Sequence, residues 1–273
     1  MSKQPLISII MNCHNGEKYL RHSLNSIINQ TYKNWELIFW DNQSSDDSKK
    51  ILKSFRDKRI KYYKSLRLLN LYDARNYAIK KCKGKFLAFL DTDDWWKKNK
   101  LEKQVKKILV NKRIKLIFTN SFIYDQITKK KKIYIKKNLI SSDITQNLLD
   151  NYSISLLTVL VSKDEFKKKK FNSKLNIIGD FDYFIKLSLR SKIYYIDDTL
   201  AYYRVHSNNF SKQKLNLYIL ELKNWIINNA HLFEEKNYSL TKLRLYLKKL
   251  QLKYIFQITK INFDKILGRV VQW

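Results

Sequence analysis

Three carboxylates at the end of an apolar run are the side chains of this sequence best suited to chemistry. The run Phe86–Leu90 has the length of a buried strand, and Asp91, Thr92, Asp93 and Asp94 follow it directly. Carboxylates this close raise one another's pKa, and a bound cation removes that cost. The chain has 55 Lys+Arg against 24 Asp+Glu, so a cluster of acids is unusual in it. We therefore expect a divalent-metal site at the end of this strand.

Alternating strands and helices are predicted to position these carboxylates. Apolar runs predict strands at 6–11, 35–40, 60–64, 86–90 and 115–122, and helical spacing predicts helices at 17–30, 46–55, 73–81 and 97–110. This alternation is typical of βαβ units in a largely parallel, doubly wound sheet. Ligands of such sheets bind at the carboxyl ends of the strands. Asn12–Asn15, Asp41–Ser45 and Asp91–Asp94 should therefore meet at one edge.

The ends of the helices and the second half of the chain are predicted from weaker patterns. Asp73 and Asp94 are expected to cap the helices that follow them, and Gly84 to end the helix at 73–81. Lys129–Lys132 should lie in a hairpin or loop. Further elements are expected as a helix at 143–151, a strand at 155–161, a helix at 183–191, strands at 193–196 and 201–205, and basic helices after 212.

Composition limits the classes of protein and leaves the net charge of +31 open to three explanations. Compositional drift toward Lys and Asn, an anionic membrane surface and nucleic acid would each account for it. We do not expect nucleic acid, because the recognition modules of that class leave no signature. Cys13 and Cys82 form no metal or disulfide spacing, which fits a reduced, cytoplasmic setting. Residues 1–5 lead directly into a strand-like run, so we expect no signal peptide.

The four glycines exclude the common nucleotide-binding motifs. They stand at Gly16, Gly84, Gly179 and Gly268, and none forms a GxGxxG or P-loop pattern. A nucleotide would therefore be held by side chains and a metal.

Taken together, the motifs resemble those of the family 2 glycosyltransferases of the GT-A fold. The matching pieces run from about Leu6 to Ser211 and include DNQSSDDS, DARN, FLAFLDTDDWW, IIGDFDYF and YYRVHSNNFS. The resemblance implies an α/β GT-A domain (Rossmann-like, with a doubly wound mixed sheet) over 1–211, followed by a basic helical extension over 212–273. Members of this family transfer a sugar from a nucleotide-sugar donor to an acceptor, with inversion and with Mn²⁺ or Mg²⁺.

The resemblance also implies roles for residues on the donor side. Asp91 and Asp93 match the DxD motif, which makes Asp93 a metal ligand and Asp91 a contact to the metal or the donor ribose. Asp41 matches the element that holds the nucleobase. A hard cation at the motif would neutralise the charge that develops on a nucleotide diphosphate as it leaves.

Five more residues complete the expected site. Asn12 and Asn15 match the first-strand loop that meets the base and ribose, and Arg75 matches the helix residue beside the diphosphate. Arg204 and His206 match a loop that closes over the phosphates or the acceptor.

Asp180 is the expected catalytic base. It matches the first Asp of the family's (G/E)DxD element, and Asp182 would support or cap the helix. Inversion requires a carboxylate that takes the acceptor hydroxyl proton during attack on the anomeric carbon. As a simpler explanation, both acids would only favour a helix N-terminus.

The expected function is an inverting, metal-dependent glycosyltransferase of cell-surface polysaccharide or lipopolysaccharide synthesis. Its partners would be a nucleotide-sugar donor, by default a UDP-sugar, and a saccharide or lipid-linked acceptor. A metal-dependent nucleotidyltransferase and a non-catalytic basic binding protein remain alternatives. A stripe on the last helix, formed by Leu243, Leu247, Leu250 and Tyr254 among lysines, would contact an anionic membrane or pack on the protein.

Overall fold

The computed structural model describes residues 4–136 and 144–270, with side chains described as far as 259. The chain divides by its contacts into two compact units. The first comprises the described residues of Met1–Ile144 and Ser153–His206, and the second those of Thr145–Tyr152 and Ser207–Trp273. The boundary after residue 211, expected from the sequence, stays a prediction.

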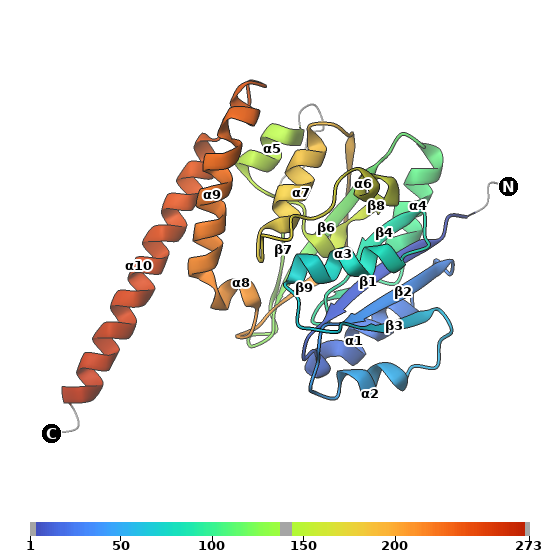
Figure 1. The fold of residues 1–273 in the computed structure, drawn as a ribbon, viewed down its shortest axis with the longest axis horizontal. Helices are drawn as coiled ribbons and strands as arrows, with labels where there is room; N and C mark the ends of the chain where they lie inside the picture. The colour runs from blue at the N-terminus through green and yellow to red at the C-terminus, as the bar shows by residue number, and fades with distance from the viewer. Residues whose placement is uncertain (1–3, 137–143, 271–273) are drawn as a thin grey trace. The chain divides into compact units, whose positions relative to one another are not determined.

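A single mixed sheet is the centre of the first unit (Figure 1). Within the described residues it has nine strands, β1 (Ile7–Cys13), β2 (Trp35–Asp41), β3 (Ile60–Lys64), β4 (Phe86–Phe89), β5 (Trp95–Trp96), β6 (Leu116–Asp125), β7 (Lys131–Ile133), β8 (Leu160–Ser162) and β9 (Ile193–Val205). Their order is β3-β2-β1-β4-β8-β6-β9-β5, with β7 paired to β6. β1 to β4 are parallel, whereas β8 lies antiparallel to β4 and β6. The expected doubly wound mixed sheet is confirmed.

Helices cover both faces of the parallel half of the sheet. In this unit they are α1 (Glu17–Ile28), α2 (Ser48–Lys53), α3 (Leu71–Lys81), α4 (Lys100–Val110), α6 (Lys163–Lys168) and α7 (Gly179–Ser188). Alternation along β1 turns Ile9 and Met11 into the core with Leu24 of α1. The opposite face of β2 carries Trp40, which stacks on Tyr77 of α3 with ring centroids 5.7 Å apart. α1 and α3 therefore lie on opposite faces of the sheet (Figure 1).

The strands and helices predicted between 6 and 122 are present near their predicted positions, but the short strand β5 was not predicted and three statements about helix ends were wrong. α3 begins at Leu71 rather than Asp73, because the Asn70 side chain accepts a hydrogen bond from the Asp73 backbone N–H at 2.8 Å. α4 begins at Lys100 with Asn99 at its N-cap position, so Asp94 does not cap it.

Gly84 does not end α3 in the left-handed conformation, because its φ is not positive. Glycine is needed at this position because there is no room for a side chain. A Cβ there would lie 2.5 Å from the backbone nitrogen of Ser8 on the neighbouring strand, closer than real Cβ atoms approach.

Two predictions in the second half of the unit also need correction. The expected strand at 155–161 is a short 3-10 helix, Leu156–Thr158, followed by β8. The two strands expected at 193–196 and 201–205 are one continuous strand, β9, whose pairing with β6 shifts register around Asn120. The basic run near 130 forms a hairpin, as expected, because β6 pairs with β7 there.

The second unit is helical, as the pattern of its sequence predicts. It contains α5 (Ile144–Asp150), α8 (Phe210–Gln213), α9 (Leu215–Glu234) and α10 (Thr241–Val270). α10 lies against α9 and is tied to α5 by an ion pair between Lys242 and Asp150. Among the described residues, no helix is long and apolar enough to cross a membrane.

Candidate active site

The carboxyl ends of β1, β2 and β4 lie side by side and carry most of the predicted site. Cys13 at the end of β1 pairs with Asp41 at the end of β2. The Leu90 N–H after β4 donates to the Ile10 carbonyl of β1 at 3.0 Å. Parallel pairing therefore brings the segments after Asn12, Asp41 and Leu90 to one edge of the sheet.

Asp41 is a buried carboxylate held in a fixed orientation. Its side chain accepts hydrogen bonds from the Ser44 backbone N–H at 2.8 Å and from the Tyr62 hydroxyl at 2.7 Å. The residue is only 2% exposed. Each carboxylate oxygen keeps a lone pair for another donor, so the group can still accept an N–H from a ligand.

Asn12 and Asn15 lie at the same edge but differ in role. Side chains alternate along β1, so Asn12 points to the α3 face of the sheet, away from Asp41. Both polar atoms of the Asn12 amide are buried and have no hydrogen-bond partner among the described residues. Asn15 has a left-handed φ of 55°, and its side chain accepts from the Ser45 backbone N–H at 2.8 Å. Asn15 thus joins the loops after β1 and β2, while Asn12 offers an unused amide.

Arg75 of α3 pairs with Asp91 at the end of β4. One guanidinium nitrogen lies 2.9 Å and 3.1 Å from the two carboxylate oxygens. The arginine side chain is 4% exposed, whereas that of Asp91 is 43% exposed and remains open to a ligand. Burial alone would lower the pKa of Arg75, but Asp91 and the nearby Tyr72 and Asp180 outweigh it and raise that pKa. Arg75 is therefore a permanent positive charge at this edge.

Asp180, at the start of α7, is oriented by the neighbouring helix. The Tyr72 hydroxyl of α3 lies 2.9 Å from one Asp180 oxygen and 2.9 Å from the Ile177 carbonyl. Gly179 allows this approach, because a Cβ there would lie 2.6 Å from the Tyr72 ring. Burial raises the pKa of the Asp180 carboxyl, while the Arg75 charge and the Tyr72 hydrogen bond oppose that rise. The carboxyl is thus a stronger base than an exposed aspartate.

Asp93 meets His206 at this edge. The His206 Nε2 atom lies 2.9 Å from an Asp93 carboxylate oxygen, and their side chains are 13% and 25% exposed. Over the residues with described positions, no group of three or more His, Cys, Asp or Glu side chains forms a metal-binding cluster. Magnesium-type ions need only one or two protein carboxylates when substrate phosphates and water complete their shell. Asp91 and Asp93, both accessible and two residues apart, fit that requirement.

Asp94 connects the DxD segment to β9 instead of capping a helix. Its carboxylate accepts the backbone N–H of Arg204 at 2.8 Å, and the residue is 2% exposed. Burial, followed by the nearby Asp93 and Asp91 charges, raises the pKa of Asp94 well above its usual range. The third carboxylate of the cluster therefore has a structural contact of its own.

The Arg204 side chain is enclosed within the same region. Its Nε donates to the Asp93 carbonyl oxygen at 2.7 Å. The guanidinium also donates to the Gln126 side chain and to Nδ1 of His22, and its carbon lies 4.5 Å from the ring centres of both Tyr19 and Trp95. Burial, and then the Arg204 charge, lower the pKa of His22, which suits its role as acceptor. These contacts fix the backbone of Asp93.

Sequence reasoning missed the partners that orient the acids. Tyr62 lies in a predicted strand and His22 in a predicted helix, and neither position carries a functional signal in the sequence. Tyr72 lies just before the predicted helix 73–81, and only the observed start of α3 at Leu71 brings it onto the same helix as Arg75, three residues later. Trp96 is buried, and its indole N–H donates to the Leu157 carbonyl at 2.8 Å.

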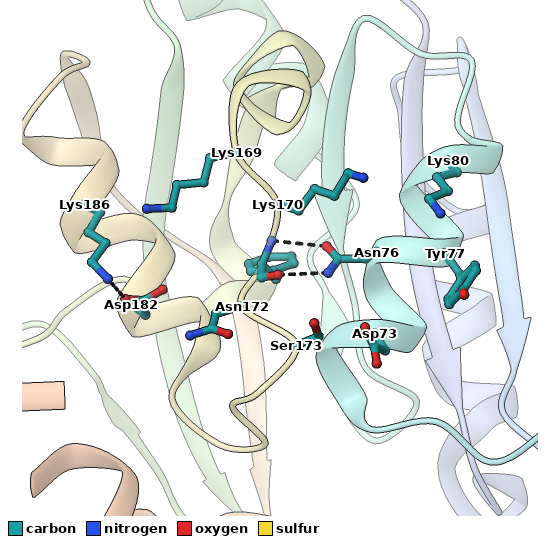
Figure 2. Close-up of a pocket in the computed structure, with 11 residues that line it drawn as sticks. Asp73, Asn76, Tyr77, Lys80, Lys169, Lys170, Asn172, Ser173, Asp182 and Lys186 are labelled. Carbon is teal, nitrogen blue, oxygen red and sulfur yellow. Dashed lines mark hydrogen bonds and ion pairs between the residues drawn. The ribbon is translucent and has the colours of Figure 1, made fainter. Parts of the chain in front are cut away.

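A groove of about 510 Å³ lies between α3 and α7 (Figure 2). The loop 169–173 forms its middle, and Asn76 fixes that loop through hydrogen bonds to the backbone N–H and carbonyl of Phe171 at 3.1 Å and 2.9 Å. Asp182, two residues after Asp180, lines the groove and pairs with Lys186. Besides Lys186, three more lysines line the groove: Lys80, Lys169 and Lys170.

Comparison with known proteins identifies the family. The model of the family "Glycosyl transferase family 2" matches residues 8–209. A UDP-Glc:alpha-D-GlcNAc-diphosphoundecaprenol beta-1,3-glucosyltransferase of Escherichia coli, WfgD, is 36% identical over 185 residues, which are 67% of this chain and 69% of that protein. A second E. coli enzyme of the same description, WfaP, is 30% identical over 215 residues, 77% of this chain and 81% of that protein.

Solved structures share the fold. The structure of S. aureus TarS 1-349 in complex with UDP superposes with a TM-score of 0.61 at 20% identity, covering 85% of this chain and 73% of that one. The mannosyltransferase PcManGT from Pyrobaculum calidifontis, in complex with GDP-Man and Mn2+, gives 0.61 at 13% identity, covering 82% and 65%. At these identities the likeness shows the fold alone, and it confirms the predicted GT-A fold.

The Asp94 contact predicts a difference between two substitutions. Asp94→Asn keeps an oxygen of similar position for the Arg204 N–H, so the free energy of unfolding should change by less than about 1 kcal/mol. Asp94→Ala leaves that N–H without a partner and should cost about 1–3 kcal/mol. Urea unfolding followed by circular dichroism measures both. Equal destabilisation by the two variants would contradict the assigned contact.

Proposed function

Because the chain belongs to glycosyl transferase family 2 and is a glycosyltransferase, we propose that it transfers a sugar with inversion from a UDP-sugar to a lipid-linked saccharide. The two E. coli relatives use UDP-glucose and an acceptor on diphosphoundecaprenol, and they support this donor and acceptor. The proposed setting is cell-surface polysaccharide or lipopolysaccharide synthesis at the cytoplasmic side of a membrane.

The contact of α3 with both acidic segments is the observation that carries the proposal. Tyr72 holds Asp180, and three residues later Arg75 holds Asp91. The Arg75 guanidinium carbon lies 5.2 Å from the centre of the Tyr72 ring. One turn of one helix therefore places the proposed base beside the proposed diphosphate site. An inverting transfer needs these two groups on either side of the reacting carbon.

The reaction follows from these positions. Asp180 accepts the proton of the acceptor hydroxyl as its oxygen bonds to the anomeric carbon. The bond from that carbon to the diphosphate breaks, and its electron pair leaves with the nucleotide diphosphate. In this proposal, the positive charge of Arg75 would stabilise the negative charge that develops on the departing oxygens. Tyr72 keeps the Asp180 carboxylate aimed during the proton transfer.

Asp91 and Asp93 are the proposed ligands of a divalent cation, Mn²⁺ or Mg²⁺, with His206 beside Asp93. The Mn2+ in the PcManGT complex is in line with a metal on this fold. Such an ion supplies further neutralisation of the diphosphate when it is bound. Arg204 holds the Asp93 backbone, so we assign it a positioning role in addition to the phosphate-closing role that the sequence predicts.

The nucleobase and ribose are assigned to the ends of β1 and β2. Asp41 has a free lone pair for the imide N–H of uracil. The buried Asn12 amide points to the other face of the sheet, so the base contact that the sequence predicts for Asn12 has no geometric support of this kind. Asn15 shapes the loop against which the ribose would lie. A thermal-shift series of nucleoside diphosphates tests this donor assignment, because bound ligand adds to the apparent stability. UDP should give the largest shift.

The groove of Figure 2 is assigned to the diphosphate of the acceptor. Lys169 and Lys170 lie on its central loop and have no ion pair among the residues with described side chains. Asp182 lines the groove and lies two residues after the proposed base on α7. We propose that a saccharide whose hydroxyl reaches Asp180 extends its diphosphate toward these lysines.

Asp93→Ala should abolish metal-dependent donor binding. The ion loses a carboxylate ligand, so addition of Mn²⁺ should no longer raise the melting temperature of the UDP-bound protein, and transfer should fall at least about 100-fold. Asp57→Ala is the control, since the ion pair of Asp57 among the described side chains is with Arg59 and the residue lies outside the proposed site. A variant that keeps metal-dependent UDP binding and full transfer would exclude Asp93 as a ligand.

Asp180→Asn should leave UDP binding intact and reduce kcat by about 10²–10⁴-fold, because the base is removed. In the unaltered enzyme, kcat/KM should rise with pH through the raised pKa of Asp180, since only the carboxylate accepts a proton.

Tyr72→Phe provides a second readout of the same base. Loss of the hydroxyl removes a hydrogen bond that lowers the Asp180 pKa, so the acid limb of the pH profile should move to higher pH. Tyr62→Phe, which alters the Asp41 contact, should change the donor KM and leave that limb in place. If Tyr72→Phe leaves the acid limb of the pH profile in place, Asp180 is not the titrating base.

Lys169→Ala with Lys170→Ala should raise the KM for a diphosphate-linked acceptor about tenfold, which corresponds to ~1.4 kcal/mol. The same saccharide without its diphosphate should be unaffected. Lys167→Ala with Lys168→Ala is a matched control, because these lysines belong to the same run but pair with Asp164 and Glu165. Equal effects on both acceptors, or from both lysine pairs, would remove the groove from acceptor binding.

A further inference from the structure

The helix α10 carries two apolar stripes on opposite faces. The stripe predicted from the sequence is the buried one, with Leu243 5% and Leu250 9% exposed and Leu247 and Tyr254 partly buried. It therefore packs on the protein, and it is not free to contact a membrane. That resolves the two roles the sequence left open for this stripe.

A second stripe, which we call the outer stripe, consists of Leu245, Leu252 and Phe256. Their exposed fractions are 50%, 56% and 71%. At about 100° per residue, spacings of seven and four place the three side chains within about 40° of one another. The same geometry turns them about 180° away from the buried stripe. A row of exposed large apolar side chains marks an interaction surface.

Lysines flank the outer stripe on both sides. Lys248 lies on one side, and Lys249 and Lys253 on the other; all three are exposed and form no ion pair among the described side chains. The sequence has no acidic residue between Lys236 and Phe263. The surface therefore combines apolar side chains with positive charge that nothing nearby neutralises.

We infer that the outer stripe binds the surface of an anionic bilayer. Its apolar side chains would enter the boundary between headgroups and acyl chains, and the lysines would meet the lipid phosphates. A second copy of the chain is a poorer occupant, because pairing of two outer stripes would bring two sets of lysines together. Nucleic acid offers no apolar layer for the leucines and the phenylalanine.

This inference deepens the membrane partner in the proposed function, because it names the surface that holds the enzyme near a lipid-linked acceptor. Lipid binding does not require transfer. Asp180→Asn should bind vesicles as the unaltered chain does, so failure of the catalytic proposal and failure of this one are distinguishable.

Vesicle flotation of the full chain tests the surface. Binding to vesicles of phosphatidylglycerol and phosphatidylcholine should fall at least about tenfold when Leu245, Leu252 and Phe256 are each replaced by Ser. Replacement of Lys248, Lys249 and Lys253 by Gln should weaken the preference for anionic vesicles over pure phosphatidylcholine. Serine at three other exposed apolar positions, Leu66, Val110 and Ile127, is the matched control and should bind normally.

A labelling experiment covers the case in which the serine variant does not fold. Cys13 and Cys82 are buried, so a polarity-sensitive dye would react selectively with Phe256→Cys or with the control Ile127→Cys. Anionic vesicles should shift the dye emission to the blue at 256 and not at 127.

Three results would overturn the inference. The first is absence of vesicle binding by the unaltered chain, and the second is full binding by a folded serine variant. The third is a dimer in lipid-free sedimentation that the serine variant dissociates, since a second copy would then cover the stripe.

Discussion

The buried guanidinium of Arg75 is the interaction on which the arrangement of this edge depends. A charge placed this deep is costly unless a partner neutralises it, and Asp91 is that partner. The ion pair fixes α3 against the end of β4, and α3 in turn carries Tyr72 to Asp180 on α7. Segments that are far apart in the sequence are thus held together by one helix turn. Because the buried charge requires its partner, α3 is held in the position that brings Asp91 and Asp180 to the same edge.

A second constraint comes from β9. This strand runs beside β6 and ends at Val205. Its penultimate residue, Arg204, donates its backbone N–H to the Asp94 carboxylate and its Nε–H to the Asp93 carbonyl oxygen. Because His206 follows two residues later, the same strand end also reaches Asp93. The acidic segment is therefore held from the α3 side by an ion pair and from the β9 side by hydrogen bonds. Two independent supports therefore fix the positions of these closely spaced carboxylates.

Much of this could be read from the sequence, because strand ends and helical spacing depend on local pattern. The convergence of Asp41 and Asp91 on one edge followed from parallel topology alone. Caps were harder, since Asn70 and Asp73 are both residue types that cap helices and spacing does not decide between them. Asn99 occupies the N-cap position of α4 without a side-chain hydrogen bond, so it leaves still less of a signal. β9 was divided in two because Asp197 and Asp198 interrupt its apolar pattern. For α10 the sequence identified one apolar stripe and left its role open, because a pattern shows that a face is apolar and only packing shows whether it is covered.

The hydrogen bonds of Asn76 to the Phe171 backbone have a consequence for how substrate range could diverge. The amide recognises main-chain atoms, so it places no demand on the side chains at neighbouring loop positions. Residues such as Lys169, Lys170 and Asn172 can be exchanged while the loop keeps its path and Asp180 keeps its partner. The side chains of this wall of the groove can therefore vary while its backbone stays in place. Substitutions in this loop could therefore change which acceptor the groove binds without altering the residues at the carboxyl ends of the strands.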